Sequence, residues 1–203
     1  MSTVKIAVIY YSATGTNYQM ALEAEKAAKE MGADVRLRRV NELAPPEAIE
    51  SNPQWKSHVE STKHVPVATL ADLEWADGIV FSVPTRFGNM AAQMKQFLDT
   101  AGPLWAQGKL TNKVVTAMSS AANPHGGQEA TILSLYTTMY HWGAIVVTPG
   151  YTDEKIYAAG GNPYGTSATA GGSVSPEVLA AVRHQTARLV DITRRLQLVS
   201  SVS

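Results

Sequence analysis

The chain of 203 residues contains no cysteine. Disulfide bridges, thiolate metal sites, iron–sulfur ligation and a cysteine nucleophile are therefore excluded. It also has no excess of charge, because 17 Lys plus Arg balance 17 Asp plus Glu, so composition gives no reason to expect nucleic acid or an anionic membrane as a partner. The N-terminal apolar run is too short to span a bilayer and lacks a signal-peptide pattern. We expect a cytoplasmic protein without membrane insertion.

Apolar runs of strand length alternate with helical patterns along most of the chain. An apolar fraction of 45% allows one sizeable core, so we expect a single domain over residues 1–203. The alternation predicts an α/β fold, a doubly wound five-stranded parallel sheet with helices on both faces. We expect strands at residues 4–11, 34–40, 78–83, 113–119 and 144–148, and the longer helices at residues 18–31, 90–98, 129–142 and 175–198.

Two stretches interrupt this alternation. Residues 41–67 hold four prolines and are too short for a core of their own, so we interpret them as an insertion or long loop, and we assign no role to its histidines, His58 and His64. Residues 149–174 form a long glycine-rich stretch. Between them, Thr69 and Asp72 have the spacing of a capping box that starts a short helix.

In parallel sheets of this kind, ligands bind at the carboxyl ends of the strands. The segment after the first expected strand runs straight into a helix and combines hydroxyls, a glycine and an amide: Ser12, Ala13, Thr14, Gly15, Thr16 and Asn17. Free backbone amides at the positive end of a helix favour a phosphate. The segment has neither the lysine of a Walker A loop nor a GxGxxG fingerprint. The alternative is an ordinary turn with a helix cap.

A second loop follows the third expected strand and consists of Pro84, Thr85, Arg86, Phe87 and Gly88. Its proline and glycine predict a tight loop that presents an aromatic ring and backbone amides to the strand ends. A flavin needs an apolar surface for its ring and hydrogen-bonding groups for its pyrimidine edge. The alternative is a surface turn with a solvated arginine.

Several longer motifs resemble one family. PTRFGNM, QMKQFLDTAGPLW and GGQEATI, followed by His141-Trp142-Gly143 and Asn162-Pro163-Tyr164-Gly165, are similar to the signature of WrbA-type NAD(P)H:quinone oxidoreductases, in the same order over nearly the whole chain. The resemblance implies a flavodoxin-like fold with strand order 2-1-3-4-5, non-covalent FMN, NADH or NADPH as electron donor, a quinone as substrate, and a homotetramer.

The same resemblance implies roles for individual residues. Ser12 to Asn17 would hold the FMN phosphate, and the loop from Pro84 to Gly88 would meet the flavin ring. A third flavin loop would consist of Ser120, Ala121, Ala122, Asn123, Gly126 and Gly127. Trp105 and His141 would line the pocket above the ring, where nicotinamide and quinone bind in turn.

The sequence departs from the family pattern in two loops. Thr14, Gly15 and Thr16 stand where the family commonly has Tyr-Gly-His, and Pro124 removes an amide donor from the third loop.

Residue chemistry agrees with a catalytic role for His141 because imidazole changes charge near neutral pH. The alternative is a histidine that stabilises a helix C-terminus. For Trp105 the alternative is a core anchor. The histidines are too few for a metal site.

The sequence thus predicts an FMN-dependent NAD(P)H:quinone oxidoreductase that delivers two electrons by ping-pong hydride transfer. A flavodoxin-type one-electron carrier is the first alternative, although the zero net charge and the insertion disfavour it. A non-enzymatic binding protein and an FMN-dependent azo- or nitroreductase are the others.

Overall fold

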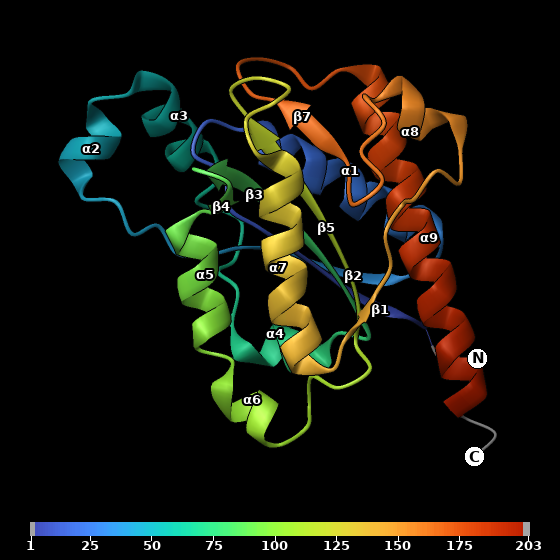
Figure 1. The fold of residues 1–203 in the computed structure, drawn as a ribbon. Coiled ribbons are helices and arrows are strands. Elements are labelled where there is room, and N and C mark those ends of the chain that lie inside the picture. Colours follow the sequence, from blue (N-terminus) through green and yellow to red (C-terminus); the bar gives the residue numbers. More distant parts are fainter. Residues whose placement is uncertain (1–2, 201–203) are drawn as a thin grey trace.

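The computed structural model describes residues 3–200, which fold around one twisted sheet (Figure 1). Its main path has the order β2-β1-β3-β5-β6, in which neighbouring strands pair in parallel. The strands of this path are β1 (Lys5–Tyr10), β2 (Asp34–Arg39), β3 (Gly78–Arg86), β5 (Val114–Ala121) and β6 (Ile145–Val146). The near-continuous apolar runs of β1, β3 and β5 form the buried centre of the sheet, as expected of parallel strands covered on both faces.

The expectation of exactly five strands is wrong, because the sheet has seven. One extra strand, β4 (Asn89–Met90), turns back and pairs antiparallel with the end of β3. The other, β7 (Ser167–Thr169), pairs in parallel with the end of β5. Both lie beyond the main path of the sheet, at the carboxyl ends of central strands. The two additions therefore extend the sheet at the edge where ligands bind in this class of fold.

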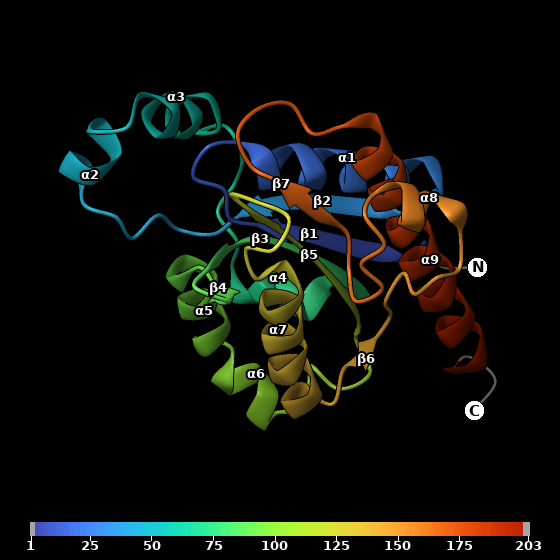
Figure 2. The same cartoon turned by 45° about the horizontal axis from the view of Figure 1, so that its top comes forward.

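Helices cover both faces of the sheet, as predicted (Figure 2). One face carries α1 (Thr16–Glu30) and α9 (Pro176–Ser200), with the short α8 (Glu154–Ala158) beside α9. The other face carries α4 (Leu70–Trp75), α5 (Ala92–Asp99), α6 (Gly102–Ala106) and α7 (Gln128–Trp142). Alternate residues of β1 show how one strand serves two cores: Val8 and Tyr10 pack under α1 and α9, whereas Ala7 and Ile9 pack under the opposite layer.

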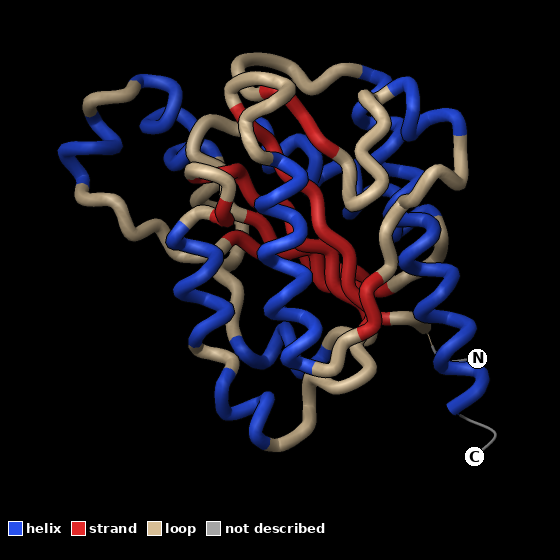
Figure 3. Tube along the Cα trace, viewed as in Figure 1, coloured by secondary structure: helices blue, strands red, loops and turns tan. Residues whose placement is uncertain are grey.

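The fifth position of the sheet is split between two short strands. The chain leaves the sheet after β6 and returns about twenty residues later as β7. The glycine-rich stretch, for which we predicted neither helix nor strand, therefore contains α8 and β7 (Figure 3). Side chains fill the gap beside β5. The Tyr136 hydroxyl accepts a bond from Ala117 N (3.0 Å), and Gln185 Nε2 donates to Ala117 O (2.8 Å). These contacts replace the missing strand pairing.

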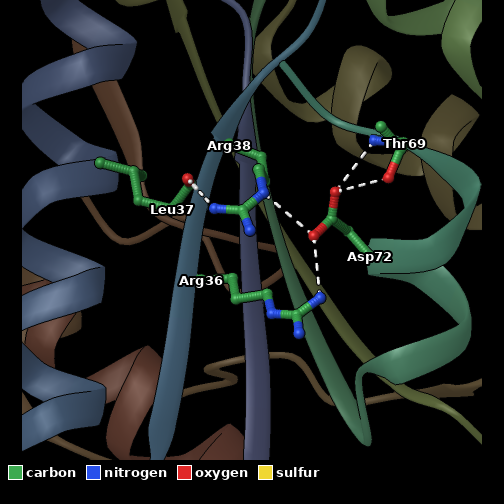
Figure 4. Close-up of polar contacts among 5 residues, drawn as sticks. All are labelled: Arg36, Leu37, Arg38, Thr69 and Asp72. Atoms are coloured by element: carbon green, nitrogen blue, oxygen red, sulfur yellow. Dashed lines mark hydrogen bonds and ion pairs between the residues drawn. The ribbon is translucent and has the colours of Figure 1, made fainter. Parts of the chain in front are cut away.

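The edge strand β2 is fastened to α4 through a buried carboxylate (Figure 4). Asp72 accepts hydrogen bonds from Arg38 Nε (3.0 Å) and Arg36 Nη1 (3.2 Å). Its other oxygen accepts from the backbone and the hydroxyl of Thr69, which completes the predicted capping box. The Arg36 guanidinium also lies 4.0 Å from the centre of the Trp75 ring.

The segment predicted as an insertion contains two short helices, α2 (Pro46–Glu50) and α3 (Pro53–Ser61). Neither has a buried residue, which agrees with the expectation that it has no core of its own. The segment projects from the body of the molecule on the side of the loop after β1 (Figure 1). Over residues 3–200, none of the helices has both the length and the apolar character that crossing a membrane requires.

Candidate functional site

Three loops converge at the carboxyl ends of β1, β3 and β5 and enclose a cleft of about 370 Å³. This volume is within the ordinary range of small-molecule sites. Most of the residues predicted to bind a cofactor line it, together with Ala170 of the glycine-rich stretch: Ser12, Ala13, Thr14, Thr16, Asn17, Pro84, Thr85, Arg86, Phe87, Ser120, Ala121, Ala122, Asn123 and Gly126. None of the described lining residues is acidic, so the cleft suits an anionic ligand.

The first loop leads directly into α1 and leaves the helix N-terminus without a side-chain cap among the described residues. Gly15 occupies the N-cap position with φ of +101°, a backbone conformation that glycine adopts without strain. The first turn contains no acidic residue. The amides at the start of α1 and the positive end of its dipole therefore face the loop without a protein anion to neutralise them.

The side chain of Asn17 links the first loop to the ends of β3 and β5. Its side-chain amide donates to Ser82 Oγ (3.1 Å), and its carbonyl oxygen accepts from Ser120 Oγ (2.6 Å). Ser82 Oγ in turn donates to the backbone oxygen of Asn17 (3.0 Å). All three side chains are buried, so this network ties the start of α1 to β3 and β5. Ser82 was missed at the sequence level, although it is the one polar residue in the apolar run of β3.

The second and third loops touch each other where both have glycine. Thr85 Oγ1 accepts hydrogen bonds from Gly88 N (3.2 Å) and from Thr131 Oγ1 (2.8 Å) on α7. Gly127, with φ of +95°, lies so close that a Cβ there would stand 2.9 Å from Gly88 Cα. Within the third loop, a Cβ on Gly126 would stand 2.4 Å from Ala121 Cβ. Side chains at these glycines would push the loops apart.

Phe87 stands at the tip of the second loop in a strained conformation. Its φ is +53°, unusual for a residue with a side chain, and its ring is fully exposed. The neighbouring Arg86 donates only to the backbone oxygen of Thr85 (2.9 Å) and is also exposed. Strain of this kind persists where the surroundings fix it, commonly at ligand sites. An apolar ring and a cation are thus held at the mouth of the cleft.

A carboxylate fixes the insertion beside the cleft. Glu42 accepts hydrogen bonds from Tyr11 Oη (2.9 Å), Trp55 Nε1 (3.1 Å) and Gln93 Nε2 (2.6 Å). Burial opposes its charge, but the bonds from Gln93, from Tyr11 and from the backbone of residues 43 and 44 outweigh burial and lower the pKa of Glu42. Burial, reinforced by the Glu42 charge, raises the pKa of Tyr11. Sequence patterns did not identify this cluster, because its members come from four separate segments.

Trp105 and His141 are brought together, but not at this cleft. Trp105 Nε1 donates to the backbone oxygen of His141 (2.9 Å), and both side chains are exposed. His141 is near the C-terminus of α7, whereas the cleft is at the end where α7 begins (Figure 1). Neither residue lines the cleft of its own chain, so the predicted roles require another copy of the protein.

Solved structures with a similar fold come from the flavodoxin class. A WrbA-like flavodoxin from Agrobacterium tumefaciens superposes with a TM-score of 0.68 at 20% identity, covering 95% of this chain and 99% of that one. An archaeal flavodoxin superposes with a TM-score of 0.62 at 15% identity, covering 94% and 99%. At these identities the likeness shows the fold alone, which is flavodoxin-like α/β.

The chain belongs to the NADPH-dependent FMN reductase family, whose pattern residues 4–155 match. It is 53% identical to an NAD(P)H dehydrogenase (quinone) of Deinococcus radiodurans, over 95% of this chain and 97% of that protein. A relative of the same name from Methylocella silvestris is 41% identical over 95% and 98%. These similarities confirm the resemblance that the sequence motifs indicated.

Proposed function

We propose that this protein is an FMN-dependent NAD(P)H:quinone oxidoreductase that uses the cleft at the ends of β1, β3 and β5. The observation that carries the proposal is the combination of an uncapped α1 N-terminus with an acid-free cleft that extends over two further loops. Such a site suits a ligand with one phosphate and a flat polar ring. Membership of the FMN reductase family and the names of its relatives support the same conclusion.

The residues present fit FMN. The amides and hydroxyls of residues 12–16 would hold the phosphate, while Asn17 keeps that loop in place through Ser82 and Ser120. Residues 84–87 and 120–123 would flank the ring system. When bound, FMN supplies the redox chemistry, accepting a hydride from NADH or NADPH and passing two electrons to a quinone. The chain itself contributes orientation, exclusion of acidic groups and the positive end of the α1 dipole.

One cleft for both substrates predicts that they bind in turn. Initial rates measured with varied nucleotide at several fixed benzoquinone concentrations should give parallel double-reciprocal lines, the pattern of a ping-pong reaction. Intersecting lines would contradict shared use of the cleft. Loss of FMN on dialysis should abolish activity, and added FMN should restore it, because the flavin is held without a covalent bond.

The proposal includes a homotetramer in which neighbouring copies complete each cleft. Trp105 and His141 are exposed, adjacent to each other and distant from the cleft of their own chain. Placed at another copy's cleft, they would provide an aromatic wall and a hydrogen-bond donor for a quinone. Sedimentation velocity should give the mass of a tetramer, and dilution that dissociates it should reduce quinone reduction more than FMN binding. A fully active monomer would refute this part of the proposal.

A further inference from the structure

The insertion places a histidine against the first loop. A Cβ added to Gly15 would lie 3.6 Å from His58 Nδ1, so a side chain at this position would meet the imidazole of α3. The His58 ring also packs against Tyr18 of α1, with ring centroids 5.5 Å apart and planes at 57°. Its ring nitrogens have no hydrogen-bond partner among the described residues. His58 is thus held beside the start of α1 with its polar atoms free for another ligand.

A second opening shares a wall with the cofactor cleft at this point. It measures about 480 Å³ and lies between α3 and the glycine-rich stretch. Thr14 lines both spaces. The described residues around the second one carry no acid, and most of their side chains are polar: Gln54, Ser57, His58 and Ser61, together with Pro53, Gly171 and Gly172. His58 therefore lines an opening that adjoins the cofactor cleft at Thr14.

The cofactor cleft has little fixed positive charge for a phosphate. Residues 12–17 include no lysine or arginine. Among the described residues that line the two spaces, the side chains able to carry positive charge are Arg86, on the second loop, and His58. A phosphate monoester carries about −1.5 to −2 charges near neutral pH. Of the two, His58 is the one beside Gly15 of the first loop.

The position of α3 is determined by two sets of contacts. Asn52 caps the helix through bonds from the backbone amides of Gln54 and Trp55, each 3.1 Å long. The Trp55 indole then donates to Glu42, which is fixed by Tyr11. Tyr11 directly precedes Ser12. The hydrogen bonds through Glu42 that orient α3 are therefore attached to the same strand end as the first loop.

We propose that His58 carries the positive charge that faces the FMN phosphate, and that it makes this site select phosphorylated flavin over riboflavin. The inference rests on the proposed function, because it assigns the ligand of the first loop to FMN. Binding of the phosphate then draws a proton onto His58. The proton comes from solvent, and no covalent bond is made or broken.

The surroundings of His58 agree with this role. In the unliganded protein, burial lowers the pKa of His58, so the ring is mostly neutral at pH 7. The titratable groups around it are Tyr18 from α1 and those that line the adjoining cavity: Tyr10, Tyr11, Arg39, Glu42 and Lys63. Burial raises the pKa values of both cavity tyrosines, which stay neutral. A phosphate dianion would become the strongest charge beside the ring and would raise its pKa.

The test compares FMN with riboflavin on three proteins: wild type, His58→Gln and His64→Gln. His64 is exposed in the same insertion and serves as the matched control. We expect His58→Gln to weaken FMN binding by about tenfold or more, the equivalent of a pKa shift of one unit, and to leave riboflavin binding unchanged. His64→Gln should change neither affinity. Wild-type affinity for FMN should also fall as pH rises above neutrality, and His58→Gln should lack that dependence.

Histidine NMR titration of the wild-type protein gives a readout that does not depend on the variant folding. The pKa of His58 should rise by at least about one unit with FMN and stay constant with riboflavin. Equal FMN affinity in wild type and His58→Gln, or an unchanged His58 pKa, would overturn the inference and leave the proposed function intact. Failure of the wild-type protein to bind FMN would overturn both.

Discussion

Substitution of Tyr136 by Phe removes one buried hydroxyl and tests how the split fifth position of the sheet is held together. Tyr136 is 1% exposed, and its hydroxyl makes two hydrogen bonds. It accepts from Ala117 N on β5 (3.0 Å) and donates to Tyr164 O (2.8 Å), just before β7. Burial raises the pKa of Tyr136 to about 12, so the hydroxyl is protonated at neutral pH.

The magnitude follows from what the phenylalanine leaves behind. A buried donor or acceptor without a partner costs about 1–3 kcal/mol. Tyr164 belongs to a surface segment, where its carbonyl oxygen can be hydrated, whereas Ala117 N is fully enclosed. We therefore expect Tyr136→Phe to lower the free energy of unfolding by about 1–3 kcal/mol. Ring packing is preserved, so no cavity contributes to this figure.

Urea unfolding followed by circular dichroism measures this loss, with an unchanged slope as evidence that the folded state remains compact. Tyr140→Phe is the matched control, because Tyr140 lies one turn along α7 and is 63% exposed. It should change stability by less than about 0.5 kcal/mol. If Tyr136→Phe lost no more stability than the control, the idea that the Tyr136 hydroxyl stands in for the missing strand hydrogen bonds beside Ala117 would be refuted.

Three further substitutions test the ion pairs of Asp72, the contact between the second and third loops, and the attachment of the insertion. Asp72→Asn should cost about 2–3 kcal/mol at neutral pH. Burial opposes the charge of Asp72, but the bonds from Thr69 and the two arginines outweigh burial and lower the pKa of Asp72. The stabilisation of the fold by the Asp72 carboxylate is therefore complete above about pH 4 and is lost as pH falls through the folded-state pKa. Unfolding of wild type and variant at several pH values would show this difference shrinking in acid, and a constant difference would contradict it. Gly127→Ala should lower the free energy of unfolding by about 1–3 kcal/mol and weaken FMN binding, because the new Cβ would meet Gly88 Cα and the φ of this residue is positive. Titration calorimetry with FMN measures the affinity, and an unaltered affinity would mean that the two loops can separate freely. Glu42→Gln should increase amide hydrogen exchange in α3 while leaving β1 protected, and equal exchange would mean that Glu42 does not hold the insertion.

Much of the fold was predictable because the central strands carry strong signals. The apolar runs of β1, β3 and β5 and the periodic pattern of α7 reflect burial on one or both sides, which dominates residue choice. The two extra strands have no such signal. β7 is three residues long, and its place is set by contacts with residues distant in the sequence. One of these is the close approach of Gly165 to β5, where an added Cβ would stand only 2.0 Å from Ala117 O.

The part of the candidate site that could be predicted consists of the loops that directly follow the central strands. Segments directly after β1, β3 and β5 must meet at one edge of a parallel sheet, and they do. The contribution of the insertion could not be predicted, since α3 has no fully buried residue and its place is set by polar contacts with distant segments. Trp105 and His141 show the other limit: motif similarity suggests a role for a residue but does not say which copy of the chain supplies it.

The proposed function requires that the cleft hold FMN and pass reducing equivalents from a nicotinamide nucleotide to a quinone. Anaerobic stopped-flow absorbance on the FMN-loaded protein tests it most directly, with NADH or NADPH mixed first and benzoquinone second. We expect rapid bleaching of the visible flavin band by at least one nucleotide, then rapid recovery with one hydroquinone formed per flavin. If FMN binds but neither nucleotide bleaches it, or if benzoquinone does not restore the band, the proposed oxidoreductase activity is contradicted.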